Sequence, residues 1–271
     1  MSNREFNAYI SQKISVSPEI IILRIVPDGW DLPEFDPGQY AVLGLPGSAP
    51  RVELSDADES PVDPDKFILR AYSVASASRQ KEYLELYVTL VRSGALTPRL
   101  FALNPGDKIH LAPKIKGVFT INELPSDLNL VLMGTGTGLA PYMSMIRSCI
   151  RPGEKRKFAV VHGARHSWDL GYRSELMTIR NITDNLAYIP IISRPKLEMV
   201  PWAGEVGYVQ QVWDRNLISD QWGFQPTPEN THVFLCGNPG MIESAVTLLA
   251  SHGFKEHSKR SPGEVHLEKY W

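Results

Sequence analysis

Apolar and polar residues follow two different rhythms along the chain, with the change near residues 122–127. Before it, short runs rich in β-branched and aromatic residues are separated by turn sequences such as Asp-Pro-Gly at residues 36–38. These runs predict six strands, at residues 9–16, 20–26, 39–45, 67–75, 83–90 and 108–111. Residues 83–91 alternate strictly between apolar and polar side chains, which predicts a half-buried strand of an antiparallel sheet or barrel. One helix is expected at residues 97–103, with Thr97 as its N-cap and Pro98 at its first position.

After residue 127, apolar runs alternate with helical patterns. We expect strands at residues 128–133, 158–162, 187–192 and 231–236, and helices at residues 140–150, 173–182, 206–214 and 241–251. Strand–helix alternation of this kind predicts a parallel sheet with helices on both faces. The 271 residues therefore divide into a β domain, residues 1–122, and an α/β domain, residues 123–271.

Composition narrows the class of protein. With 28 Lys and Arg against 30 Asp and Glu, the net charge is −2, so no global field favours nucleic acid or an acidic membrane. Two cysteines cannot build a disulfide framework, a zinc cluster or a protein-held iron–sulfur cluster. We expect no signal peptide, since the first residues carry no basic flank followed by an apolar stretch, and no apolar run approaches the ~20 residues of a membrane span. We expect a cytoplasmic protein with no nucleic-acid or membrane partner.

The strongest local signal is a glycine-rich turn between the strand at residues 128–133 and the helix that follows. Its sequence, Gly-Thr-Gly-Thr-Gly-Leu-Ala-Pro at residues 134–141, presents backbone N–H groups and a helix N-terminus to an anion. It is not a Walker loop, because no Gly-Lys-Ser/Thr follows, and Leu139 breaks a strict GxGxxG pattern. Phosphate binding is the favoured interpretation over an ordinary strand-to-helix turn.

Polar groups follow the next strands at the same edge of the predicted sheet. Arg165 stands where NAD-binding folds carry an acidic residue for the ribose, and an Arg suits the 2′-phosphate of NADP. Ser193 and Arg194 follow the next strand, and Cys236 ends the strand before a Gly-Asn-Pro-Gly turn. Taken singly, solvated arginines and an inert buried cysteine explain these positions equally well. Their shared place at strand carboxyl ends favours a ligand site.

A second constellation lies in the β domain. The strand at residues 67–75 carries Arg70 and Tyr72 on one side, with Ser73 beside them. A cation for phosphate, an aromatic ring and a hydroxyl suit a flat, phosphate-bearing cofactor, although a polar edge strand explains them as well.

Together these motifs resemble the ferredoxin–NADP⁺ reductase superfamily, and in particular its bacterial FAD-containing ferredoxin (flavodoxin)–NADP⁺ reductases. The resemblance covers nearly the whole chain, including the aromatic end Tyr270-Trp271. It implies a six-stranded antiparallel β-barrel that binds FAD, then an α/β parallel-sheet domain for NADP whose C-terminal segment folds back on FAD. It also implies an oxidoreductase that moves electrons between NADPH, by hydride transfer to flavin N5, and ferredoxin or flavodoxin. We expect a monomer with no bound metal.

The same resemblance implies individual site residues. Those expected to contact FAD are Arg70, Ala71, Tyr72, Ser73, Leu86, Tyr87, Val88, Gly94, Ala95, Leu96, Thr97, Thr137, Tyr270 and Trp271. Those expected to contact NADP are Gly136, Thr137, Gly138, Arg165, Ser193, Arg194, Cys236, Gly237, Asn238 and Pro239. Those expected to set the flavin–nicotinamide geometry, and so to act in catalysis, are Ser73, Cys236 and Tyr270.

One departure from the resemblance keeps alternatives open. Close relatives often carry Thr-Gly-Arg after the Ser-Arg strand, whereas this chain has Ala-Gly-Glu, with Glu205 in place of the Arg. Because a carboxylate there would repel a phosphate, an NADH-preferring flavin or oxygenase reductase of the same superfamily stays open. A non-catalytic flavin-binding sensor is the other alternative. The basic residues expected to meet an acidic carrier are Lys114, Lys116 and the run at residues 147–157.

Overall fold

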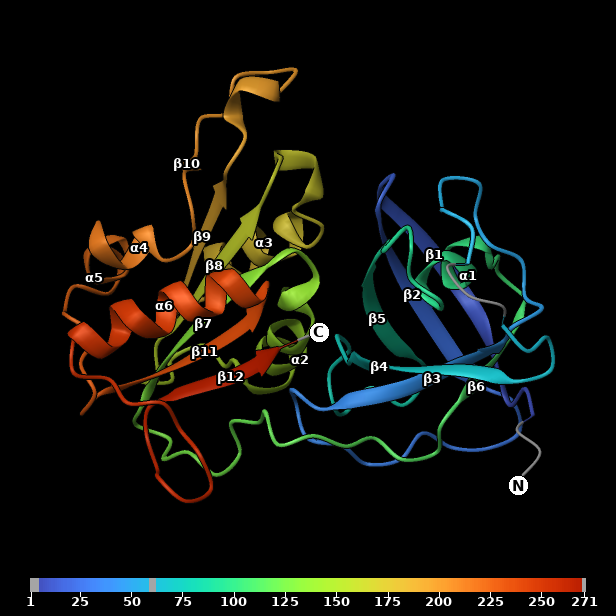
Figure 1. The fold of residues 1–271 in the computed structure, drawn as a ribbon. Coiled ribbons are helices and arrows are strands. Elements are labelled where there is room, and N and C mark those ends of the chain that lie inside the picture. Colours follow the sequence, from blue (N-terminus) through green and yellow to red (C-terminus); the bar gives the residue numbers. More distant parts are fainter. Residues whose placement is uncertain (1–4, 59–61, 270–271) are drawn as a thin grey trace. The chain divides into compact units, whose positions relative to one another are not determined.

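The chain forms two compact units in the computed structural model, which describes residues 5–58 and 62–269. The first unit comprises Met1–Thr120 together with Met143–Ser148, and the second comprises Ile121–Tyr142 together with Cys149–Trp271. Figure 1 shows the mostly β first unit in blue to green and the α/β second unit in green to red. Among the described residues, no helix is long and apolar enough to cross a membrane.

The first unit is an antiparallel β-barrel, as predicted. Its elements are β1 (Ala8–Ser17), β2 (Ile20–Pro27), β3 (Tyr40–Pro46), β4 (Phe67–Ser73), β5 (Leu84–Thr89), α1 (Thr97–Ala102) and β6 (Lys108–Leu111). The strands pair in the order β4-β3-β6-β1-β2-β5. An antiparallel bridge between Val74 and Leu86 joins the end of β4 to β5 and closes the barrel. Inward-facing side chains such as Leu23, Leu43 and Leu84 are completely buried and form the core.

Two local expectations for this unit are wrong. Both faces of β5 are buried, because Glu85, 1 % exposed, pairs with Arg24 at 2.8 Å and with Arg147 at 2.6 Å. Ion pairing thus lets a carboxylate stay buried on the strand face opposite the barrel core, which alternation alone assigns to solvent. Thr97 is not the N-cap of α1, since Leu96 holds that position and the Thr97 hydroxyl instead accepts a hydrogen bond from the Val91 N–H at 3.0 Å.

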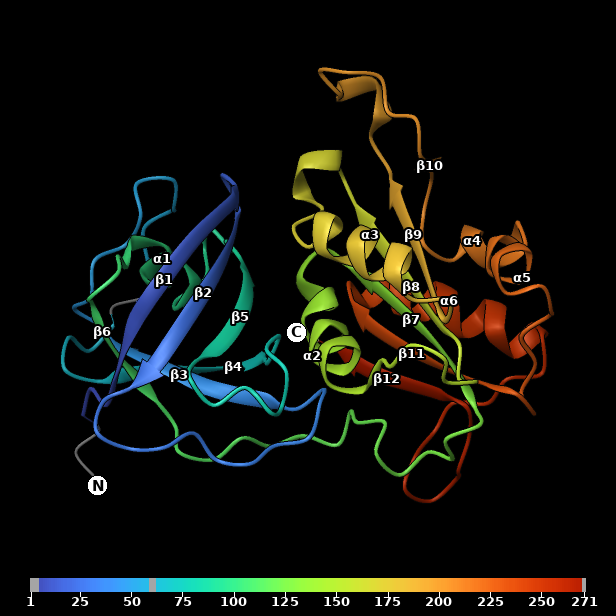
Figure 2. The same ribbon diagram turned by 180° about the vertical axis from the view of Figure 1, so that it is seen from behind.

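The second unit is a parallel sheet covered on both faces, also as predicted. Its strands are β7 (Asn129–Thr135), β8 (Phe158–Ala164), β9 (Leu186–Ile192), β10 (Glu205–Val206), β11 (Thr231–Gly237) and β12 (Val265–Lys269). The helices that follow β7 in the chain are η1 (Gly136–Leu139), α2 (Ala140–Cys149), η2 (Ser167–Asp169), α3 (Arg173–Ile182), η3 (Pro195–Leu197), α4 (Gln211–Asp214), α5 (Leu217–Trp222) and α6 (Pro239–Ser251). Of α2, Met143–Ser148 belong to the first unit. Figures 1 and 2 show α4, α5 and α6 on one face of the sheet and α3 on the other.

Strand order places the ligand-binding edge of this sheet. The order is β10-β9-β8-β7-β11-β12, and all pairs are parallel. The chain runs outward from β7 through β8 and β9, then returns to the other side of β7 with β11. Parallel sheets bind ligands at the carboxyl ends of strands where the order reverses, which here are those of β7 and β11.

Two elements of this unit differ from the expectation. Residues 206–214 were expected to be one helix, but Glu205–Val206 is a strand that pairs with β9, and α4 begins only at Gln211. Gly207, with φ +132°, lies between them in a conformation that other residues rarely adopt. Strand β12 was not predicted, because its half-buried side chains include a His, a Glu and a Lys.

Candidate functional site

The turn after β7 fits tightly against the end of β11. A Cβ atom at Gly138 would lie 2.3 Å from the carbonyl oxygen of Cys236, so only glycine fits there. Gly136 has φ +54° and nothing near its Cβ position, which leaves this side of the turn open. The Asn238 N–H donates to the Thr135 hydroxyl at 3.1 Å and ties the two strand ends together. The result is a rigid, open cradle of backbone suited to a phosphate.

The strand end after β11 also starts a helix. The side-chain oxygen of Asn238 caps α6 by accepting from the N–H groups of Gly240 at 2.9 Å and Met241 at 3.2 Å, and Pro239 begins the helix. Gly237, with φ +133°, lies against Thr135. Asn238 therefore lies at the carboxyl end of β11, as expected, and its side-chain amide oxygen is engaged in capping α6.

One row of residues crosses the sheet directly behind this turn. In register order it contains His162 of β8, Gly134 of β7, Cys236 of β11 and Glu268 of β12. The completely buried Cys236 thiol donates a hydrogen bond to a Glu268 carboxylate oxygen at 3.6 Å. Sequence reasoning missed Glu268. The available signal was the alternation of Val265 and Leu267 with polar residues, which marks a strand.

His162 is the register partner of Gly134 in the neighbouring strand. Its ring is completely buried, and its Nδ1 lies 3.3 Å from the Tyr188 hydroxyl. Burial lowers the pKa of His162 to about 3, opposed by the backbone of Gly136 in the turn above it. His162 is therefore a neutral support beneath the glycine turn and supplies no positive charge to a phosphate.

Two exposed guanidinium groups stand at neighbouring strand ends. The Ser193 N–H donates to the Ala164 carbonyl at 3.0 Å, and the Arg194 N–H donates to the Arg165 carbonyl at 3.0 Å, so the backbones after β8 and β9 run side by side. Among the described residues, neither arginine side chain is paired with a carboxylate. Two unpaired cations so placed suit a dianion such as a phosphate monoester.

The carboxylate expected to disturb this region is itself paired. Glu205 forms an ion pair with Arg215, which also donates to the Val206 carbonyl at 3.2 Å. The Trp202 indole N–H donates to the Glu205 carbonyl at 2.8 Å, and the Trp202 ring lies 4.8 Å from the Arg173 guanidinium carbon. These contacts fix the backbone of β10 and give Glu205 a counter-charge.

The barrel holds the second candidate site, around β4 and β5. The Val74–Leu86 bridge and the hydrogen bond from the Ala75 N–H to the Glu85 carbonyl at 2.8 Å place the end of β4 beside β5. They bring Tyr72 and Ser73 next to the buried residues Leu86, Tyr87 and Val88.

Tyr72 has the polar group in the barrel that most clearly suits a ligand. Its hydroxyl is buried and has no hydrogen-bond partner within the described part of the chain. Burial raises the pKa of this hydroxyl, opposed by the nearby positive charge of Arg70, so the phenol stays a neutral donor. Arg70 is exposed, and its guanidinium donates one hydrogen bond to the Leu69 carbonyl at 2.8 Å. An aromatic ring with an unsatisfied hydroxyl and an available cation fit a flavin nucleotide.

The loop before α1 completes this site. Arg99, 2 % exposed, donates to the Ala95 carbonyl at 2.7 Å, and Arg51 donates to the Gly94 carbonyl at 3.1 Å. Both arginines also form ion pairs with Asp58. The hydrogen bond from Arg99 is the main cause that lowers the pKa of the Asp58 carboxyl.

The same loop also carries backbone donors. The N–H groups of Ala95, Leu96 and Thr97 have no hydrogen-bond partner in the described ranges 5–58 and 62–269. Three adjacent free N–H groups form a small anion-binding concavity. The residues present in the barrel therefore fit FAD, from ring to pyrophosphate.

Two expected residues cannot be placed. Tyr270 and Trp271 lie outside the described residues. The remaining expected residues divide between the two units: Arg70–Thr97 belong to the barrel, and Gly136, Thr137, Gly138 and those from Arg165 onward belong to the α/β unit.

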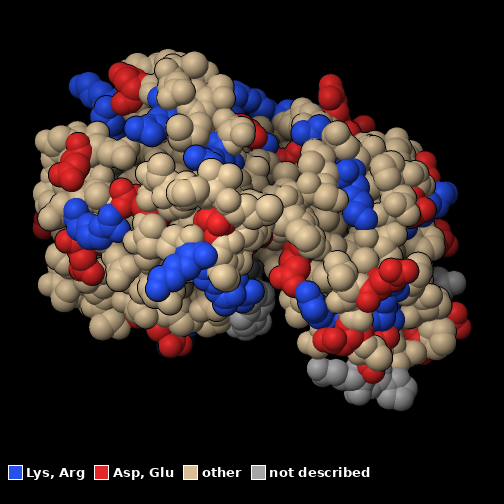
Figure 3. Space-filling view, turned by 90° about the horizontal axis from the view of Figure 1, so that it is seen from above, with Lys and Arg blue, Asp and Glu red and all other residues tan. Residues whose placement is uncertain are grey.

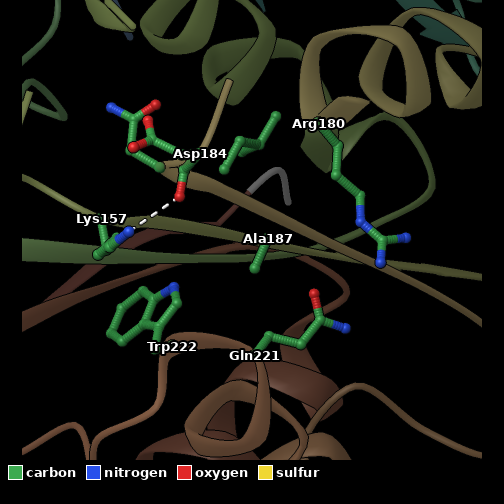
Figure 4. Close-up of a pocket in the computed structure, with 8 residues that line it drawn as sticks. Lys157, Arg180, Asp184, Ala187, Gln221 and Trp222 are labelled. Atoms are coloured by element: carbon green, nitrogen blue, oxygen red, sulfur yellow. Dashed lines mark hydrogen bonds between the residues drawn. The ribbon is translucent and has the colours of Figure 1, made fainter. Parts of the chain in front are cut away.

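A separate pocket of about 310 Å³ lies at the opposite edge of the parallel sheet. Figure 4 shows Lys157, Asp184 and Arg180 around it, with Trp222 and Gln221 along one side. The Lys157 ammonium is tied to the Asp184 carbonyl at 2.8 Å. Because this pocket adjoins the amino-terminal ends of β8 and β9, it is not part of the ligand edge described above.

Comparison with known proteins agrees with this geometry. Residues 59–117 match the model of the oxidoreductase FAD-binding domain, and residues 132–247 match that of the oxidoreductase NAD-binding domain. The chain is thus an oxidoreductase with FAD-binding and NAD-binding domains in series. A flavodoxin/ferredoxin–NADP reductase of Buchnera aphidicola subsp. Baizongia pistaciae is 34 % identical over 208 residues, which cover 76 % of this chain and 82 % of that protein. This chain belongs to the family of flavodoxin/ferredoxin–NADP reductases.

A further relative is similar in sequence, and a solved structure shares the fold. The flavodoxin/ferredoxin–NADP reductase of Escherichia coli K12 is 29 % identical over 240 residues, or 88 % of each chain. A ferredoxin NADP⁺ reductase from Neisseria gonorrhoeae, solved with bound FAD and NADP, is 22 % identical and matches the fold with a TM-score of 0.81 over 100 % of both chains.

Proposed function

We propose that this chain is an FAD-dependent reductase that exchanges electrons between NADPH and a one-electron carrier protein, ferredoxin or flavodoxin. The observation that carries the proposal is the unsatisfied, buried Tyr72 hydroxyl in the barrel, combined with a glycine cradle and two unpaired arginines in the α/β unit. When bound, FAD supplies the redox chemistry, taking a hydride at N5 from NADPH and releasing electrons singly. We assign residues 1–122 to FAD binding and residues 123–271 to NADP binding, with the C-terminal segment over FAD.

Within the barrel, each polar group has a separate task. The Tyr72 ring would stack on the flavin, Arg70 would pair with the pyrophosphate, and Ser73, 5 % exposed, would hydrogen-bond at the flavin edge near N5. The free N–H groups of Ala95, Leu96 and Thr97 would bind the phosphates.

Within the α/β unit, the cradle and the arginines would orient NADPH. The turn at Gly136, Thr137 and Gly138 would hold its pyrophosphate, while Arg165 and Arg194, with Ser193, would bind its 2′-phosphate. Cys236 would lie against the nicotinamide, with its thiol oriented by Glu268. Tyr270 would cover the flavin and move to admit the nicotinamide.

The proposed docking surface for the carrier draws on the basic residues near Lys114 and in the run 147–157. Within that run Arg147 is paired with Glu85, while Arg156 and Lys157 donate to the backbone carbonyls of Pro125 and Asp184 and keep their charge. In the view of Figure 3, Lys and Arg side chains are interspersed with Asp and Glu rather than gathered into one field. Lys114, Lys116 and Lys155, all exposed, are the first docking candidates. Carrier reduction should slow as salt rises, and a rate independent of salt would reject electrostatic docking.

The direct test uses the purified protein and an electron carrier. It should show flavin absorbance, release FAD on denaturation, and reduce added ferredoxin or flavodoxin with NADPH as the electron source. A yellow protein that NADPH does not reduce would instead favour the sensor alternative. We further propose that it acts as a cytoplasmic monomer, which sedimentation of the holoprotein tests for its oligomeric state.

A further inference from the structure

We infer that the Glu205–Arg215 ion pair determines how strongly this chain prefers NADPH over NADH. Arg215 acts as a positioning residue that cancels the charge of a carboxylate beside the 2′-phosphate region. The inference rests on the proposed function, since it concerns the same nucleotide site. Its physical basis is that the Glu205 carboxylate is placed near Arg165 and Arg194, the two cations proposed to bind the 2′-phosphate.

The position of Glu205 follows from strand register. Glu205 pairs with Ile191 in the parallel ladder, and the Gly207 N–H continues it with a bond to the Ile192 carbonyl at 2.9 Å. Ser193 lies two residues beyond Ile191, so strand spacings place the Cα atoms of Glu205 and Ser193 roughly 8 Å apart. This is within one Debye length, about 8–10 Å at moderate salt, so the two regions interact electrostatically.

Glu205 is paired with an arginine that lies ten residues later in the chain. Arg215 follows α4 and reaches back to β10, where it binds both the Glu205 carboxylate and the Val206 carbonyl. Both side chains stay partly accessible, 42 % for Arg215 and 35 % for Glu205, so the pair contributes little to folding stability. Its effect on a nearby anion is larger, because the pair presents no net charge where an unpaired Glu205 would present −1.

The charge on Glu205 should therefore affect the binding of NADPH but not the binding of NADH. An unpaired carboxylate at this separation opposes a 2′-phosphate dianion and should weaken its binding roughly three- to five-fold after screening. NADH lacks the phosphate, so its binding should stay nearly unchanged. The sequence departure at Glu205 is thus compensated ten residues later by Arg215.

The experiment replaces Arg215 by methionine, which keeps a long aliphatic stem and removes the charge. In the FAD-loaded protein, Arg215→Met should lower the ratio of kcat/KM for NADPH to that for NADH about three- to five-fold. Calorimetric titration with adenosine 2′,5′-bisphosphate should show the same weakening, while adenosine 5′-monophosphate binding stays unchanged. Both differences should shrink at high salt.

A second variant separates the charge effect from a structural one. In the double variant Glu205→Gln with Arg215→Met, the wild-type ratio should return, and Glu205→Gln alone should not lower it. Arg92→Met is the matched control, because Arg92 forms a comparable exposed pair with Glu19 at 2.7 Å in the barrel unit. This control should leave the ratio unchanged.

Two results would overturn the inference. One is an unchanged ratio and unchanged bisphosphate binding in Arg215→Met. The other is a loss that persists in the double variant, which would mean that Arg215 binds the nucleotide or supports the fold directly. Neither touches the proposed function, which fails instead if NADPH does not reduce the flavin of the wild-type protein.

Discussion

His162 should make the α/β unit sensitive to mild acid. The imidazole is completely buried, and burial lowers its pKa to about 3 from an ordinary value of 6.5. In the unfolded chain it takes up a proton below pH 6.5, while in the folded chain it stays neutral until about pH 3. Its contribution to stability is therefore complete above pH 6.5 and is lost progressively as the pH falls toward 3.

The size of the effect follows from the same two pKa values. Between pH 7.5 and pH 5.5, preferential protonation of the unfolded chain at His162 should cost about 1.4 kcal/mol. For a chain of this size, that corresponds to a Tm lower by roughly 3–5 °C. His232 and His266 add in the same direction, because burial lowers the pKa of each. The contribution of His162 must therefore be isolated by a variant.

The assay is thermal unfolding of the wild-type protein and of His162→Gln, followed by circular dichroism from pH 7.5 to 5.5. The Gln variant should start from a lower Tm but lose less of it on acidification, by roughly 3–5 °C. His252, exposed at the end of α6, is the matched control, and His252→Gln should keep the wild-type slope. Parallel slopes for the wild type and His162→Gln would refute the assignment of a neutral, buried imidazole.

Three further predictions concern the nucleotide sites. Arg165→Ala should raise the KM for NADPH about tenfold with little change for NADH, since one charge-assisted hydrogen bond is lost; equal effects on both would argue against 2′-phosphate contact. Gly138→Ala should abolish NADP⁺ binding while flavin absorbance persists, because the new methyl group would meet the Cys236 carbonyl at 2.3 Å; normal titration with NADP⁺ would show that the turn can move. Deletion of Tyr270 and Trp271 should change nicotinamide affinity or the rate of flavin reduction, and an unaltered stopped-flow trace would remove Tyr270 from the mechanism.

Much of the fold was predictable because local signals and tertiary structure agree. The barrel strands and the glycine turn carry strong periodicity and turn chemistry, and both appear where expected. Glu85 shows where such reasoning stops, since its burial depends on Arg24 and Arg147, which are distant in sequence. The charges near the nucleotide edge show the same limit, because the partner of Glu205 is known only once α4 is folded against β10.

The sequence proposes the residue types of the candidate site but not the residues that support them. Tyr72, Gly138 and Arg165 belong to short motifs that sequence alone indicates as candidate ligand-binding residues. Glu268 and Arg99 do not, because their importance comes from contacts across the fold: the Cys236 thiol for Glu268, and the Ala95 carbonyl for Arg99. Buried positioning groups of this kind leave little local trace in sequence.

The central claim is that NADPH delivers hydride to a flavin held by this chain. The most direct measurement is anaerobic stopped-flow absorbance of the purified yellow protein mixed with NADPH, and separately with NADH. The visible flavin absorbance band should bleach with both, and markedly faster at equal, subsaturating concentrations of NADPH. Absence of bleaching by NADPH, or faster bleaching by NADH, would contradict the account.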